Sequence, residues 1–110
     1  MKSVCVVLLM LFATTAFGGS AKGVINDLRA SNKANTVIFG VTGDIDEAGS
    51  CNKWEMFGIS LQTEGGKAVF ELVKFAYLNQ LEIEVFGLGT CKAHWRSEDV
   101  KDVHLKRAAT

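Results

Sequence analysis

Histidine, cysteine and tryptophan are the side chains of this 110-residue sequence whose types could carry chemistry. Their spacing fits none of the usual catalytic arrangements. The sequence has no Gly-x-Ser-x-Gly elbow, no glycine-rich phosphate loop and no His-Glu-x-x-His pair. The only histidines are His94 and His104, and a lone histidine is a weak signal of catalysis. The sequence therefore predicts a protein that is not an enzyme and that needs no cofactor.

Cys51 and Cys91 are expected to form a disulfide. Cys5 lies in an N-terminal segment that we expect to be removed, which leaves these two cysteines in a small exported domain. The chain-entropy estimate for the long loop between them is about 4 kcal/mol, so reduction should threaten a domain of this size. The alternative is a metal pair of Cys91 with His94 at Cys-x-x-His spacing, which lacks a second half-site.

A second candidate metal cluster is acidic. Asp44, Asp46 and Glu47 lie close together in the sequence and could hold calcium. Their spacing is not that of an EF-hand loop, and an acidic loop of this kind is usually just solvated. No metal site is predicted.

Trp54 and Trp95 each lie near one of the disulfide cysteines. Exported proteins that hold sugars often present the face of a tryptophan to the sugar ring, although both residues could equally belong to the core. Trp95 is the stronger candidate because its neighbours are polar donors suited to hydroxyl or carboxylate groups. The predicted glycan-binding residues are Trp95, Lys92, His94, Arg96 and Ser97.

The N-terminus predicts export to the periplasm or secretion. Lys2 precedes an apolar run over residues 4–12 that is too short to span a bilayer. Residues 16–18 then place a bulky side chain between two small ones, a pattern that signal peptidases accept. We predict a signal peptide over residues 1–18 and cleavage after Gly18, with positions two residues to either side nearly as suitable. The alternative is a short membrane anchor.

The charge balance argues against nucleic acid as a partner. The chain has 12 basic and 12 acidic residues, and removal of Lys2 with the signal leaves 11 against 12, a net charge of about −1. A nucleic-acid binder normally shows a clustered basic face. The only candidate cluster is Lys106-Arg107 with Lys101 nearby, which is typical of a solvated tail. We expect no nucleic-acid partner and, with no second long apolar run, no membrane span in the mature protein.

Residues 19–110 contain no repeat, no low-complexity tract and no proline, which predicts a single domain. Alternation of apolar and polar side chains predicts three strands before any helix. In the first of them, Val24 and Leu28 are expected on one face and Ile25 on the other. The three predicted strands cover residues 22–29, 36–43 and 54–63.

After Gly65 and Gly66 the period changes, which predicts a helix over residues 67–80. Its polar strip is narrow, and its apolar arc covers more than half the circumference, wider than the stripe of about 100° that a surface helix needs. We therefore expect the helix to contact another subunit. The polar strip is Lys67, Glu71 and Lys74, with Leu78 continuing the line. The predicted oligomer-interface residues are Val69, Phe70, Leu72, Val73, Phe75, Ala76 and Tyr77.

Two more strands are predicted after the helix, over residues 81–86 and 100–105. The chain is thus mainly β with one helix, in the order β-β-β-α-β-β. This is the order of the OB-fold, a five-stranded Greek-key barrel with a helix between its third and fourth strands. The Cys51–Cys91 bridge would tie the two halves of that barrel together across the helix.

Short motifs in the mature chain carry a resemblance to a known family. They are Gly58-Ile59-Ser60-Leu61, Gly66-Lys67-Ala68, Ile83-Glu84-Val85, Gly89-Thr90-Cys91 and Glu98-x-Val100. Together they resemble small exported bacterial proteins similar to the B subunits of subtilase-cytotoxin and pertussis-like AB5 toxins. The resemblance implies an OB-fold homopentamer whose helices line a central pore, a host glycan receptor and a toxin A subunit as partner. The loops diverge, so no sugar-contacting residue carries over. The alternative is a monomeric periplasmic or secreted structural or inhibitory domain with no glycan ligand.

Overall fold

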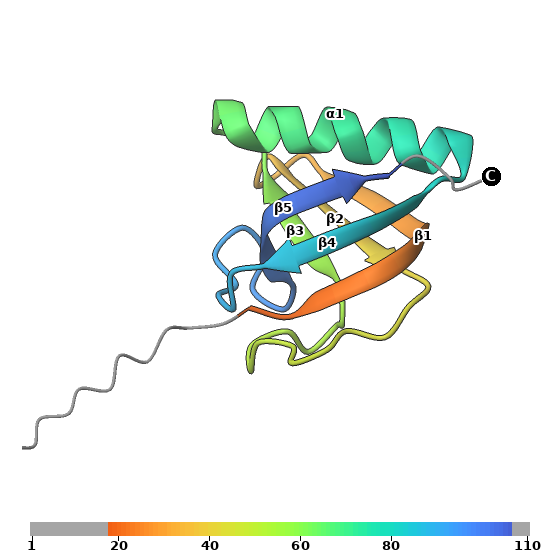
Figure 1. The fold of residues 1–110 in the computed structure, drawn as a ribbon. Coiled ribbons are helices and arrows are strands. Elements are labelled where there is room, and N and C mark those ends of the chain that lie inside the picture. The colour runs from red at the N-terminus through yellow and green to blue at the C-terminus, as the bar shows by residue number, and fades with distance from the viewer. Residues whose placement is uncertain (1–17, 107–110) are drawn as a thin grey trace, which may run out of the picture.

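The computed structural model describes residues 18–106, which form five strands and one helix (Figure 1). The order, three strands, then the helix, then two strands, confirms the predicted order. The elements are β1 (Ser20–Ser31), β2 (Thr36–Val41), β3 (Phe57–Ser60), α1 (Glu64–Asn79), β4 (Glu82–Gly87) and β5 (Glu98–Leu105). The predicted signal peptide, apart from Gly18, and Arg107 of the basic tail lie outside the described residues.

The five strands pair in a closed order, β1-β2-β3-β5-β4, because β4 also pairs with β1. All pairs are antiparallel except β3 with β5, which run parallel through Phe57 opposite Glu98 and Gly58 opposite Asp99. Every strand therefore has a hydrogen-bonded neighbour on both sides. The long strand β1 pairs with β4 through its first half and with β2 through its second half.

An irregularity in β1 overturns one prediction. The register with β2 shifts between Ile25 and Asp27, as it does at a β-bulge. The extra residue at a bulge interrupts the alternation of side chains between the two faces, so residues three apart can face the same side. Ile25 is 4% exposed and belongs to the core, and Leu28 packs against that core as well. The prediction that Leu28 shares a face with Val24 and opposes Ile25 was wrong for this reason.

The hydrophobic core lies inside the closed sheet and under the helix. Figure 1 shows α1 lying across one side of the sheet, and the helix contacts β1, β3 and β5. Phe39 of β2 and Phe57 of β3 are fully buried, with ring centroids 5.8 Å apart. The predicted alternation in the fourth strand is confirmed. The core residues are Ala21, Ile25, Val37, Phe39, Phe57, Ile59, Val73, Ala76, Ile83 and Val85.

The helix begins three residues earlier than predicted because Thr63 caps it. The Oγ1 atom of Thr63 accepts a hydrogen bond from the backbone N–H of Gly66 at 2.9 Å, the usual bond between an N-cap side chain and the third helical residue. A Cβ added at Gly66 would overlap the carbonyl of Ser60, so only glycine fits there. Gly65 and Gly66 thus form the first helical turn, and β3 ends at Ser60 rather than at residue 63.

Strand β3 is also shorter than predicted at its start. It begins at Phe57, which leaves Trp54 in the turns that precede it. Strand β5 begins two residues earlier than predicted, at Glu98. The N–H of Glu98 donates to the carbonyl of Met56 at 3.0 Å, which joins the start of β5 to the loop that carries Trp54.

Candidate functional site

Two loops, residues 42–56 and residues 88–97, are tied to each other. The first connects β2 to β3 and the second connects β4 to β5. A disulfide joins Cys51 in the first loop to Cys91 in the second, as the sequence predicted. The N–H of Trp54 also donates to the carbonyl of Arg96 at 3.0 Å. The two predicted tryptophans are therefore held in neighbouring segments.

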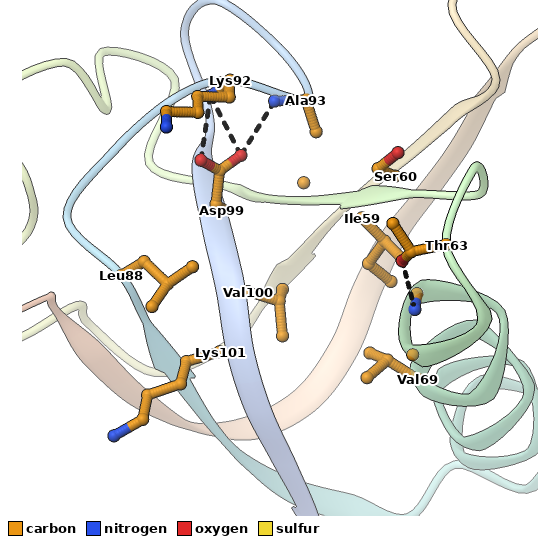
Figure 2. Close-up of a pocket in the computed structure, with 13 residues that line it drawn as sticks. Ile59, Ser60, Thr63, Val69, Leu88, Lys92, Ala93, Asp99, Val100 and Lys101 are labelled. Carbon is orange, nitrogen blue, oxygen red and sulfur yellow. Dashed lines mark hydrogen bonds between the residues drawn. The ribbon is translucent and has the colours of Figure 1, made fainter.

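Asp99, at the start of β5, fixes the second loop from within. Its carboxylate accepts hydrogen bonds from the backbone N–H of Lys92 at 2.9 and 3.0 Å and from that of Ala93 at 2.8 Å (Figure 2). The hydroxyl of Thr90 donates to the same carboxylate at 2.6 Å. Asp99 is only 9% exposed, so these bonds compete little with water. They hold the backbone before Trp95 in one conformation.

Glu98 is the neighbouring residue, and its side chain is fully buried. Its Oε2 atom accepts from the N–H of Gly19 at 2.6 Å and of Gly89 at 2.9 Å, and Oε1 accepts from that of Gly49 at 2.9 Å. This one carboxylate therefore links both loops to the start of β1. Three backbone donors replace the water that the carboxylate loses on burial.

The sequence analysis missed both carboxylates. The one available signal was an acidic pair, Glu98-Asp99, directly before an apolar strand. Neighbouring side chains of a strand point to opposite faces, so the strand pattern alone does not show what either carboxylate binds. Their donors are backbone N–H groups of glycines and loop residues, which carry no mark in the sequence.

An exposed aromatic patch lies on these two loops. The Trp95 side chain is 67% exposed, and the guanidinium carbon of Arg96 lies 4.0 Å from the centre of its ring. The Trp54 side chain is 43% exposed and its ring centroid lies 4.6 Å from that of His94. The guanidinium carbon of Arg29, in β1, lies 5.9 Å from the centre of the Trp54 ring. We call these five residues, Arg29, Trp54, His94, Trp95 and Arg96, the tryptophan surface.

The surroundings of His94 within this surface favour the neutral form of its imidazole. Its partial burial, and secondly the positive charge of Arg29, lower the pKa of the imidazole below its usual value. The Nδ1 atom accepts a hydrogen bond from the N–H of Arg96 at 3.2 Å, which requires that this nitrogen carry no proton. Protonation of His94 would therefore disturb the loop that holds Trp95.

The predicted glycan-binding residues do not all reach the surface. Trp95 and Lys92 are exposed, while His94 and Arg96 are partly buried. Ser97 is completely buried, and its Oγ atom has no hydrogen-bond partner among residues 18–106. Ser97 therefore has no surface on which a glycan could rest. Trp54 and Arg29, which were not in the predicted set, complete the patch.

A hollow of about 410 Å³ lies beside the second loop, between β3, β5 and the first turn of α1. Figure 2 shows Ile59, Val69, Leu88 and Val100 around it. Two of its polar groups are already engaged, because Asp99 holds the loop and the Oγ1 of Thr63 caps the helix. The hollow thus offers mainly apolar walls and few free polar groups, which suits a sugar less well than the tryptophan surface does.

The predicted oligomer-interface residues divide into two groups. Val73 and Ala76 are fully buried, and Val69 and Phe70 pack against the core, so these residues serve the protomer itself. Leu72 is half-buried. Phe75 and Tyr77 are exposed at 53% and 40%. Leu78, placed by the sequence analysis on the polar strip, is exposed at 71% and joins them.

The candidate metal ligands are not brought together. Within residues 18–106, no group of three His, Cys, Asp or Glu side chains is placed to hold a metal ion. Cys91 is bonded to Cys51 and is therefore unavailable as a partner for His94. In the same part of the chain, no helix has the length and apolar character needed to cross a membrane.

Comparison of the chain with protein-family models, with curated proteins and with solved structures found no match. The geometry of the described residues is therefore the guide to a function. Its most distinctive feature is the tryptophan surface, whose second loop is held by a disulfide and by Asp99.

Proposed function

We propose that the protein is an exported, non-enzymatic binding protein that recognises a glycan through the tryptophan surface. The observation that carries this proposal is Trp95, a large aromatic side chain that stays 67% exposed on a loop with a fixed backbone. Indole combines a broad apolar face with a polar edge, which suits the mixed surface of a sugar. The side chains around it supply the hydrogen-bond donors that hydroxyl groups need.

The fixed backbone favours binding. A loop that must be ordered when a ligand arrives reduces affinity, whereas a loop that is already ordered does not. The disulfide and the bonds to Asp99 order the second loop in advance. Trp95 and its neighbours are therefore pre-organised for a ligand.

The charges of the tryptophan surface favour an acidic sugar. The guanidinium of Arg96 lies over the Trp95 ring, and a guanidinium has five N–H donors, which suit a carboxylate. Lys92 is exposed in the same loop. Arg29 is engaged by Asp27 through two hydrogen bonds of 2.9 and 3.0 Å, so it contributes less. A carboxylate-bearing glycan fits this balance.

We further propose that the fold is an OB-fold. The closed strand order, the parallel pairing of β3 with β5 and the helix between β3 and β4 support this assignment. OB-folds bind oligosaccharides and oligonucleotides on the face of their second and third strands and on loops that include the one between the fourth and fifth. In this protein that loop carries Trp95.

A homopentamer and a toxin A subunit belong to the same proposal. Phe75, Tyr77 and Leu78 are the exposed large apolar side chains of α1 that would meet a neighbouring subunit, since exposed apolar patches usually mark contacts. Val73 and Ala76 are buried within the protomer, which reduces the apolar surface of α1 that remains for such a contact. The alternative is a monomeric structural or inhibitory domain.

A glycan array tests the binding proposal. The exported, oxidised protein is compared with Trp95→Ala and with a matched control, Leu88→Ala, an exposed apolar residue of the same loop that lies on the hollow. We expect the Trp95 variant to lose about tenfold or more in affinity for the glycans that the protein binds, and the Leu88 variant to keep its affinity. An array without a hit, or a hit unaffected by Trp95→Ala, contradicts the proposal.

Light scattering tests the assembly separately. We expect the oxidised protein to have the mass of a pentamer and Leu78→Lys, which replaces the most exposed apolar side chain of the helix with a charge, to reduce that mass. Lys101→Glu, a charge change on exposed strand surface, is the control. A monomer mass for the unmodified protein supports the alternative function instead.

A further inference from the structure

We propose that the buried carboxylate of Glu98 is the binding site for a new α-ammonium group, produced by cleavage of the peptide bond between Gly18 and Gly19. The inference rests on the export part of the proposed function and is independent of glycan binding. The proposal assigns a cleavage site and the carboxylate that binds the new N-terminal ammonium group.

The first observation is a carboxylate without a counter-charge. Glu98 is fully buried, and its three donors are all neutral backbone N–H groups. Among residues 18–106, the ion pairs involve other carboxylates and leave Glu98 without a cation. Burial of a charge is costly unless a charge of opposite sign accompanies it. A positive group at the Gly19 nitrogen would provide that charge.

The second observation is the position of the Gly19 nitrogen. It lies 2.6 Å from Oε2 of Glu98, closer than the nitrogens of Gly49 and Gly89, which both lie at 2.9 Å. An ammonium group at this nitrogen would therefore be within hydrogen-bond distance of the carboxylate, and such charge-assisted bonds are stronger than neutral ones. Gly19 itself is buried, so the nitrogen sits inside the protein rather than in water.

The third observation is that Gly19 and Ser20 are bonded to the rest of the fold through their backbone groups. The carbonyl of Gly19 accepts from the N–H of Gly87 at 2.8 Å, and Ser20 exchanges two backbone hydrogen bonds with Asp46 at 2.8 and 3.0 Å. Cleavage after Ser20 would remove all of these contacts. Cleavage after Gly18 removes none of them.

Gly18 itself occupies a crowded position. A Cβ at residue 18 would overlap the carbonyl of Gly87 and lie 2.6 Å from Oε2 of Glu98. Loss of Gly18 therefore leaves room around the new amine, where an ammonium group needs space for two further N–H bonds. Of the three cleavage positions that the sequence allows, the geometry favours the bond between Gly18 and Gly19.

The chemistry is peptide hydrolysis by the peptidase of the export pathway. Water adds across the bond: its oxygen completes the carboxylate of Gly18 on the released peptide, and the Gly19 nitrogen becomes an amine. An α-amine has a pKa of about 8, so it is protonated at neutral pH. The neutral amide donor of the precursor is thereby replaced by a cation against Glu98, and processing and folding stability become coupled.

The experiment begins with export of the full chain in a bacterial host and the intact mass of the recovered protein. We expect a mass that corresponds to a chain starting at Gly19. The α-amine is then labelled at neutral pH with an amine reagent, and labelling at the N-terminal peptide is followed by mass spectrometry. We expect the α-amine of the folded protein to be labelled at least about tenfold more slowly than that of the unfolded protein. The charge-assisted bond to Glu98 must open before the amine can react.

Two variants refine the test. Glu98→Gln should restore fast labelling of the folded protein, while Glu82→Gln, an exposed carboxylate on β4, should leave labelling slow. If Glu98→Gln does not fold, the start of the mature chain and the comparison of folded with unfolded natural protein can still overturn the proposal. A mature chain that starts at any other residue, or an α-amine that reacts equally fast in both states, overturns the proposal whatever the glycan array shows.

Discussion

The loop between β4 and β5 and the outer face of α1 both expose large apolar side chains, but the protein holds them in different ways. Trp95 sits on a loop fixed by a disulfide and by the buried carboxylate of Asp99. Phe75 and Leu78 sit on the outer face of a helix, where the side chains form surface ion pairs such as Lys74 with Glu71 at 3.4 Å. Such pairs contribute little to stability.

The difference separates two causes of exposure. On the helix, the apolar arc is wider than the sheet can cover, so part of it remains outside whether or not a partner exists. In the loop, several buried interactions hold a short segment in place and leave a tryptophan in solvent. The second arrangement is the more specific of the two, and this is why the proposed glycan site is on the loop.

Reduction of the disulfide should have the largest effect. The bridge spans 40 residues of sequence, and its loss should lower the free energy of unfolding by about 4 kcal/mol, since the unfolded chain regains that loop entropy. Denaturant unfolding with and without a reducing agent measures the change.

The control for reduction is a double variant, Cys51→Ser with Cys91→Ser, whose unfolding should not respond to the reducing agent. Equal midpoints for the oxidised and reduced natural protein would show that the bridge does not hold the loop.

Removal of the Asp99 carboxylate comes next. Asp99→Ala leaves the N–H groups of Lys92 and Ala93 without their acceptor and should lower the free energy of unfolding by about 3 kcal/mol. Asp102→Ala, an exposed carboxylate of the same strand, should change it by less than about 0.5 kcal/mol. Denaturant titration gives both values, and similar effects for the two variants would argue against a clamped loop.

On the helix side, loss of the N-cap should have a moderate effect. Thr63→Ala removes the oxygen that accepts from Gly66 and should lower the free energy of unfolding by about 1 kcal/mol. Thr63→Ser keeps that oxygen and should stay close to the natural protein. Thermal unfolding monitored by circular dichroism checks this, and an alanine variant as stable as the serine variant would mean that the cap is not formed in solution.

The smallest expected effect is the pH dependence contributed by His94. Burial lowers the pKa of this histidine in the folded protein, so the unfolded chain takes up the proton first as the pH falls. The contribution of neutral His94 to the free energy of unfolding is therefore fully present above the usual histidine pKa of about 6.5. It is lost as the pH falls through the lower pKa that His94 has in the folded protein. Melting temperatures between neutral and mildly acidic pH measure it.

The matched variant for this pH effect is His94→Gln, whose melting temperature should fall less on acidification than that of the natural protein. His104→Gln serves as the control, since His104 is exposed on β5. A steeper fall in the His94 variant would contradict the assignment of a neutral, partly buried imidazole.

Local patterns in the sequence were enough to predict most of the secondary structure. The alternation through Val37 and Phe39, and again through Ile83 and Val85, predicted buried strand faces that the structure confirms. The change of period after Gly66 predicted the helix, and two remaining cysteines predicted the bridge. Each of these features depends on residues close together in the chain or on a single available pairing, so the sequence determines it directly.

Tertiary structure alone decided the rest. The bulge that brings Ile25 and Leu28 to one side follows from the two partners of β1, which the strand's own pattern does not reveal. The role of Glu98 depends on glycines 9, 49 and 79 residues away in the chain. Backbone N–H groups look alike in any sequence, so only the closed sheet, by bringing three of them to one carboxylate, shows why a glutamate is buried there.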